Sequence, residues 1–109
     1  MKNSTHAPGY VAFYPMLSEI ARDNGYSLSI HGSVQRDFDL VAIPWIDEAN
    51  TEDELVQSLA KYVASVMGIS FHKKAEIDGP EEKPHGRHSY SIQVGNGAYL
   101  DISIMTRRT

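Results

Sequence analysis

The stretch Asp37-Phe38-Asp39-Leu40-Val41-Ala42-Ile43-Pro44 decides the fold of this chain. Its aliphatic and aromatic residues favour a β-strand over 37–43, and the proline, which has no backbone N–H, predicts where the pairing of this strand ends. Successive side chains of a strand point to opposite faces. The apolar residues at positions 38, 40 and 42 therefore face a core, while Asp37 and Asp39 share the other face. The stretch predicts a sheet that is covered on one face.

Helical patterns precede and follow this strand. Apolar residues at helical spacing predict a helix over 10–24, which Gly25 ends. Thr51 and Glu54 form a capping box, which predicts that a second helix begins there and runs to Gly68.

Four further strands complete the predicted sheet. Alternation of apolar and polar residues indicates strands over 26–31, 69–77, 88–94 and 99–105. The sequence Gly-Asn-Gly at 95–97 predicts a hairpin between the last two strands, and the prolines and glycine of 78–84 predict a loop. The chain is therefore expected to form an α+β domain, with a mixed five-stranded sheet and two helices packed on one face.

Length and composition narrow the class of protein. The 109 residues suffice for one domain, which we place at 10–109 behind a flexible tail at 1–9. The chain has no cysteine, which excludes disulfides and thiolate metal sites, and its net charge of -4 argues against non-specific nucleic-acid binding. No signal peptide is recognisable, and no apolar stretch approaches the ~20 residues that cross a bilayer. We expect a cytoplasmic protein that does not enter a membrane.

A third acid has the same strand parity as the first two. Asp101 lies between a leucine and an isoleucine that face the core, so its carboxylate faces the other way. If its strand is a neighbour of 37–43, Asp37, Asp39 and Asp101 converge on one patch. Crowded carboxylates repel one another, and Mg²⁺ or Mn²⁺ relieves that repulsion by binding their oxygens. The three acids are therefore candidate metal ligands and catalytic residues; the alternative is that they are solvated strand residues.

The run from Gly32 to Val41, Gly-Ser-Val-Gln-Arg-Asp-Phe-Asp-Leu-Val, resembles the signature of the polymerase-β-type nucleotidyltransferase superfamily. That signature has a Gly-Ser after a first strand, a strand that bears Asp-x-Asp, and a third acid on a later strand. The length of the chain is similar to that of the minimal nucleotidyltransferases, some of which are antitoxins that modify a partner toxin. The stretch Arg-Asp-Phe-Asp-Leu-Val-Ala-Ile-Pro-Trp also resembles small bacterial and phage proteins with no established activity.

The resemblance implies a nucleoside triphosphate held through Mg²⁺ or Mn²⁺, and a protein as partner or acceptor. It places Gly32 and Ser33 near the phosphates and gives the three acids the metal-binding and catalytic roles. Arg36 is a further candidate phosphate ligand. Lys83 and Arg87 are candidates on chemical grounds, because ammonium and guanidinium groups bind phosphate. The alternative for these two residues is a solvated loop that enters a strand.

The loop before the acids favours a different function. Only three residues separate Ser33 from Asp37, whereas members of the superfamily usually place a longer segment with a short helix there. A turn this short cannot present a helix N-terminus to a triphosphate. Two hypotheses follow. The chain is an enzyme that transfers a nucleotidyl group to a macromolecular partner, or it is a catalytically inactive protein of the same fold that binds a partner.

Overall fold

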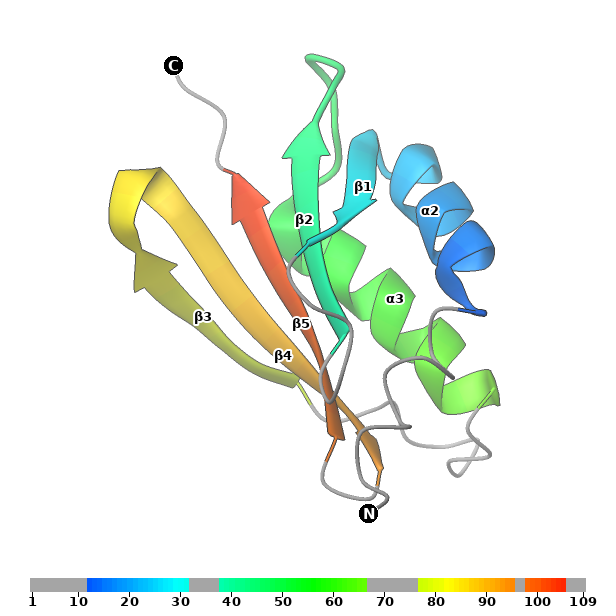
Figure 1. The fold of residues 1–109 in the computed structure, drawn as a ribbon. Helices are drawn as coiled ribbons and strands as arrows, with labels where there is room; N and C mark the ends of the chain where they lie inside the picture. Colours follow the sequence, from blue (N-terminus) through cyan, green and yellow to red (C-terminus); the bar gives the residue numbers. More distant parts are fainter. Residues whose placement is uncertain (1–11, 32–37, 67–76, 96–97, 106–109) are drawn as a thin grey trace.

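The computed structural model describes residues 12–31, 38–66, 77–95 and 98–105, and it shows a mixed five-stranded sheet with two helices (Figure 1). This is the predicted α+β architecture. In chain order the elements are α2 (Tyr14–Asp23), β1 (Tyr26–Ile30), β2 (Phe38–Pro44), α3 (Glu52–Val66), β3 (Ile77–Lys83), the 3-10 turn η2 (Pro84–Gly86), β4 (Arg87–Gly95) and β5 (Ala98–Met105).

The strands are ordered β1-β2-β5-β4-β3, so the last strand of the chain lies in the middle of the sheet. All neighbouring pairs are antiparallel except β2 and β5, which are parallel, with Phe38 opposite Leu100 and Asp39 opposite Asp101. The strand that carries Asp39 and the strand that carries Asp101 are therefore neighbours, as the acid prediction required.

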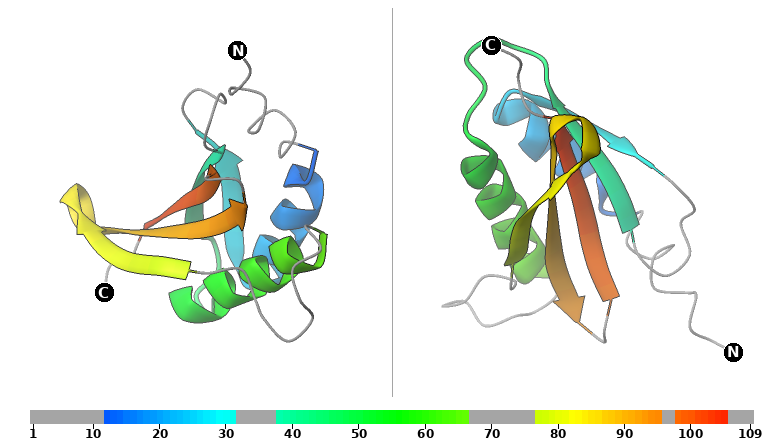
Figure 2. Two further views of the ribbon diagram at one scale, coloured as in Figure 1. Left: turned by 90° about the horizontal axis from the view of Figure 1, so that it is seen from below. Right: turned by 90° about the vertical axis from the view of Figure 1, so that its left-hand side faces the viewer.

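Both helices cover the same face of the sheet, and the other face carries no helix among the described residues (Figure 2). The helices and the covered face enclose one core of almost completely buried side chains. Its largest fully buried members are Leu17 from α2, Phe38 and Leu40 from β2, Leu55, Val56 and Leu59 from α3, Ile92 from β4, and Leu100, Ile102 and Ile104 from β5. The even parity predicted for the core of β2 is confirmed.

The helix ends follow from local chemistry. A proline occupies the first turn of α2, where its missing N–H costs nothing, and Gly25 follows the C-cap at a φ of +89°. A Cβ at Gly25 would lie 2.7 Å from the Cα of Ala49. The position therefore requires glycine both for its positive φ and for lack of space. At α3 the backbone N–H of Glu54 donates to Thr51 Oγ1 (3.1 Å), and Thr51 N–H donates to Glu54 Oε1 (2.9 Å), which confirms the capping box.

The prediction of a loop over 78–84 is wrong, because this segment forms strand β3 and pairs with β4. Pro80 is tolerated because β3 is an edge strand and its ladder is irregular between Asp78 and Glu81. The tight turn is instead η2, at Pro84–Gly86. Most of the strand predicted at 69–77, and the tail predicted at 1–9, lie outside the described residues.

Neither α2 nor α3, the two helices of the described ranges, combines the length and the apolar character that a membrane crossing needs.

Candidate functional site

Two of the predicted acids lie side by side on the face of the sheet that the helices leave uncovered. Asp39 on β2 and Asp101 on β5 are register partners on adjacent parallel strands, and both are half-buried. Strands are about 4.8 Å apart, so partner side chains on one face are in contact range. Ser91 Oγ on β4 donates a hydrogen bond of 2.8 Å to Asp101 Oδ1, which fixes the orientation of that carboxylate.

The pair belongs to a row of polar residues that crosses the whole sheet. The backbone N–H of His31 donates to the carbonyl of Asp39 (2.8 Å), which places His31 opposite Asp39 at the end of β1. On the other side Ser91 is in register with Asp101, and Asp78 is in register with Ser91. Asp39 and Asp101 of this row were predicted from the sequence, whereas Ser91 and Asp78 were not. The register of Ser91 depends on an irregularity between β4 and β5 near Gly95 that the sequence does not show, and 78–84 was predicted to be a loop.

The remaining predicted site residues do not join this pair in the described structure. Gly32, Ser33, Arg36 and Asp37 lie outside the described residues. Lys83 and Arg87 lie at the β3–β4 turn, and the register puts Arg87 four residues along β4 from Ser91, about 13 Å away at the strand rise.

Both of these basic side chains are engaged within their own hairpin. Lys83 Nζ lies 3.4 Å from Glu81 Oε1, and the Nε–H of Arg87 donates to the carbonyl of Pro84 (3.3 Å). They line a shallow hollow of about 420 Å³ with Glu82 and His88, separate from the acids.

The donor set of the acid pair fits a hard divalent cation. Mg²⁺ usually takes one or two protein carboxylates and completes its shell with water or phosphate oxygens. Asp39 and Asp101 supply that number, and the bond from Ser91 is the kind of outer contact that orients a ligating carboxylate. No group of three or more acidic, histidine or cysteine side chains suited to a metal occurs within the described ranges, which do not include Asp37.

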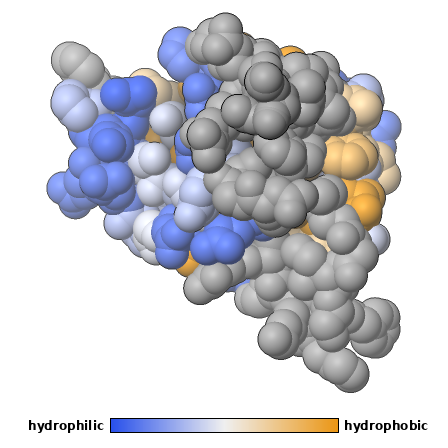
Figure 3. All heavy atoms as spheres, turned by 60° about the horizontal axis from the view of Figure 1, so that its bottom comes forward, coloured by the Kyte–Doolittle hydropathy of each residue, from blue (hydrophilic) through white to orange (hydrophobic). Residues whose placement is uncertain are grey.

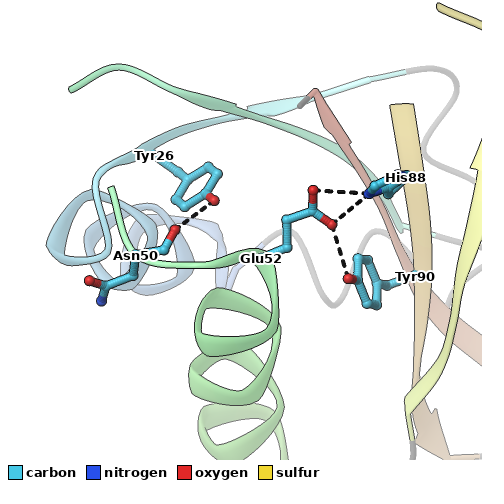
Figure 4. A network of polar contacts seen from close by, with 5 residues as sticks. All are labelled: Tyr26, Asn50, Glu52, His88 and Tyr90. Carbon is cyan, nitrogen blue, oxygen red and sulfur yellow. Dashed lines mark hydrogen bonds and ion pairs between the residues drawn. The ribbon is translucent and has the colours of Figure 1, made fainter. Parts of the chain in front are cut away.

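A second polar network lies on the covered face and joins the start of α3 to β4 (Figure 4). The carboxylate of Glu52 accepts a hydrogen bond of 3.0 Å from the hydroxyl of Tyr90. His88 Nδ1 lies 2.8 Å from Oε1 and 3.0 Å from Oε2 of the same carboxylate. Nearby, Tyr26 donates to the carbonyl of Asn50 (2.8 Å). These bonds hold the first turn of α3 against the sheet.

The network changes the acidity of Tyr90. Burial disfavours the phenolate, the hydrogen bond to Glu52 favours the neutral phenol, and the charge of Glu52 adds to both effects, so the pKa of Tyr90 is raised to about 12. This network could not be predicted from the sequence, because Glu52 and its partners are far apart in the chain. The one indication in the sequence was that His88 and Tyr90 occupy even-numbered positions of their strand, which face the core.

Tyr90 should make the stability of the fold depend on pH in the alkaline range. An unfolded tyrosine ionises near pH 10 and Tyr90 in the fold near pH 12, so between these values the unfolded state loses a proton that the folded state keeps. The contribution is fully present below pH 10 and is lost as pH rises through 12, and it amounts to at most about 2–3 kcal/mol. Urea unfolding of the wild type and of Tyr90→Phe between pH 9 and 12 measures it. The stability difference between the two proteins should shrink across this window, and a constant difference would contradict the assignment.

Comparisons with known proteins add no further assignment: no family model, no curated protein and no solved structure matches the chain. The class is therefore defined by the fold and the site alone. The chain is an α+β protein of two layers, with an in-register pair of carboxylates on the uncovered face of a mixed sheet.

Proposed function

We propose that this protein is a minimal nucleotidyltransferase-like enzyme, which uses Mg²⁺ or Mn²⁺ bound by Asp37, Asp39 and Asp101 to act on a macromolecular partner. The observation that supports the proposal is the register of β2 and β5, which puts Asp39 directly beside Asp101 on an accessible face. Two acidic side chains directly opposite each other destabilise a sheet. Their presence at the centre of this sheet is explained if a cation binds there.

The chemistry proposed for these side chains is the transfer of a nucleoside monophosphate group. A hydroxyl of the acceptor forms a bond to the α-phosphorus, the bond from this phosphorus to the bridging oxygen breaks, and pyrophosphate leaves. One carboxylate of the cluster takes the proton of the hydroxyl as general base. When bound, the divalent ion supplies charge neutralisation for the triphosphate. Ser91 holds Asp101 in place through its hydrogen bond, and so acts as a positioning residue.

The second candidate function is that of a binding protein without transferase activity. The position of the basic residues favours it, because Lys83 and Arg87 are engaged at the β3–β4 turn and do not face the acid pair. A triphosphate is normally held by cations as well as by metal. In this alternative the acid pair contributes to a surface that recognises a partner.

Titration with Mn²⁺ tests the metal site. We expect Mn²⁺ to broaden the amide signals around Asp39 and Asp101 in a nitrogen-correlated NMR spectrum, because a bound paramagnetic ion relaxes nearby nuclei. Asp39→Asn should weaken the apparent affinity for Mn²⁺ at least tenfold, because it removes one of the three carboxylates that are proposed to bind the ion. Asp78→Asn is the matched control, because it removes the same charge from the same polar row at an exposed position on the edge strand. Equal broadening in both variants, or none at millimolar Mn²⁺, would reject the site.

A further inference from the structure

The two edges of the sheet differ in how they are protected against pairing with another strand. The edge strand β3 has the sequence Ile-Asp-Gly-Pro-Glu-Glu-Lys, with a proline, four charged residues and an irregular ladder. Each of these features hinders the addition of a further strand. The opposite edge strand β1 has the sequence Tyr-Ser-Leu-Ser-Ile, with no proline, no charge and regular pairing to β2. In Figure 3, hydrophilic surface gathers on the left, the side of β3, and apolar surface appears on the right, the side of the helices.

The hydrogen-bond pattern shows which backbone groups of β1 face outward. Trp45 N–H donates to the carbonyl of Gly25, and His31 N–H donates to the carbonyl of Asp39, so odd-numbered residues of β1 face β2. Antiparallel ladders alternate, so the N–H and C=O groups of Leu28 and Ile30 point away from the sheet. The hydroxyl of Tyr14 donates to the carbonyl of Leu28 (2.6 Å), which confirms this direction. Within the described part of the chain no strand pairs with this side of β1.

A groove of about 580 Å³ runs along this edge. One wall is β1, the other is formed by Tyr14, Ser18 and Arg22 of α2, and Trp45 lies at its end. The three residues of α2 are spaced four apart and therefore lie on one face of that helix, alongside β1 (Figure 1). A groove between an edge strand and a helix is the geometry in which an extended peptide adds to a sheet.

Two side chains of the groove indicate what kind of segment fits it. Arg22 is exposed, and no side chain of the described residues forms an ion pair with it. Among the described residues that line the groove, it is the one charged side chain. Trp45 is 59% exposed although it is the only tryptophan of the chain, and an exposed indole is a frequent anchor at protein interfaces.

We propose that the groove between α2 and β1 binds an extended segment of a partner protein that carries an aspartate or a glutamate. The segment pairs with the outward N–H of Leu28, whose carbonyl already accepts from Tyr14, and with the outward N–H and C=O of Ile30, and it adds a sixth strand to the sheet. Its acidic side chain binds Arg22, and an apolar side chain packs on Trp45. The binding site does not depend on the acid pair of β2 and β5, so it stands whether or not the protein is a transferase.

Selection from a display library of random heptapeptides on the full chain tests this proposal. We expect the enriched peptides to be rich in β-branched residues and to share an acidic position. Binding of the synthesised peptides, followed by fluorescence anisotropy, should weaken at least tenfold in Arg22→Glu and less than twofold in Lys61→Glu. The second variant makes the same charge change at an exposed position of α3. Replacing the acidic residue of the peptide by lysine should restore binding to Arg22→Glu.

A second pair of variants tests the backbone pairing separately from the charge. Ile30→Pro removes an outward N–H without removing a bond to β2, and proline is tolerated on such an edge, whereas Ile30→Ala keeps the N–H. We expect peptide binding to be lost in the proline variant alone, with both variants showing wild-type circular dichroism, and the bound peptide should slow amide exchange at Leu28. Three results would overturn the proposal: no enriched peptide, peptides that bind Arg22→Glu as well as wild type, or a dimer in sedimentation that Ile30→Pro dissociates. The last would assign the edge to a second copy of the chain.

Discussion

Replacing Phe38 with alanine is expected to lower the free energy of unfolding by about 3–5 kcal/mol, the usual cost of truncating a buried phenylalanine. Phe38 has no exposed surface and is among the largest fully buried side chains. It lies on β2 with Leu100 of β5 beside it, and both side chains belong to the same buried core. The main-chain ladder to β5 limits how far the cavity can collapse.

Urea unfolding followed by tryptophan fluorescence and circular dichroism measures this loss. Ile43→Ala on the same strand is the control, because its side chain is 48% exposed on the opposite face. We expect that variant to change stability by less than about 1 kcal/mol. Similar losses in the two variants would mean that the face of β2 assigned to the core is wrong.

Transfer of a nucleotide is expected to depend on a partner and on the acid pair. The purified chain should incorporate labelled nucleotide from ATP, CTP, GTP or UTP slowly or not at all, because positioning supplies most of the rate in such reactions and Lys83 and Arg87 lie away from the acids. Addition of cell extract with Mg²⁺ or Mn²⁺ should produce labelling. Asp39→Asn should reduce that labelling by about a hundredfold or more, since loss of metal-based charge stabilisation is worth several kcal/mol.

Asp78→Asn serves as the control in this assay as well, and it should retain wild-type labelling. Rapid labelling by the purified chain alone, abolished by Asp37→Asn, would contradict the dependence on a partner. An absence of labelling with and without extract would favour the binding protein. Peptide binding at the groove is measured independently, so a failure of the transferase assay leaves that inference intact.

Local patterns in the sequence predicted the parts of the structure that neighbouring residues determine. The alternation in β2 identified the buried face, and the Thr51–Glu54 pattern identified the start of α3, because each depends on side chains a few positions apart. The juxtaposition of Asp39 and Asp101 followed from parity together with the condition that their strands are neighbours.

Features that depend on long-range contacts could not be predicted in the same way. The strand β3 contains a glycine and a proline that normally indicate a turn, and only its pairing with β4 makes it a strand. In the sequence, Glu52 is an ordinary acid in the first turn of a helix. In the fold, its carboxylate forms hydrogen bonds with His88 and Tyr90 of β4. The groove beside β1 needs the packing of α2 as well as the position of the strand in the sheet.

The central place of β5 has a consequence for how the protein is made. A ribosome releases β2 early and β5 late, and the two must pair in parallel across the intervening α3, β3 and β4. Until residues 98–105 have left the exit tunnel, β2 has β1 as its sheet partner and the carboxylate of Asp39 has no neighbour from β5. Pairings between distant segments form slowly. The nascent chain therefore passes through a stage in which the edge of β2 that pairs with β5 has no partner strand, and chaperone binding should be strongest during that interval.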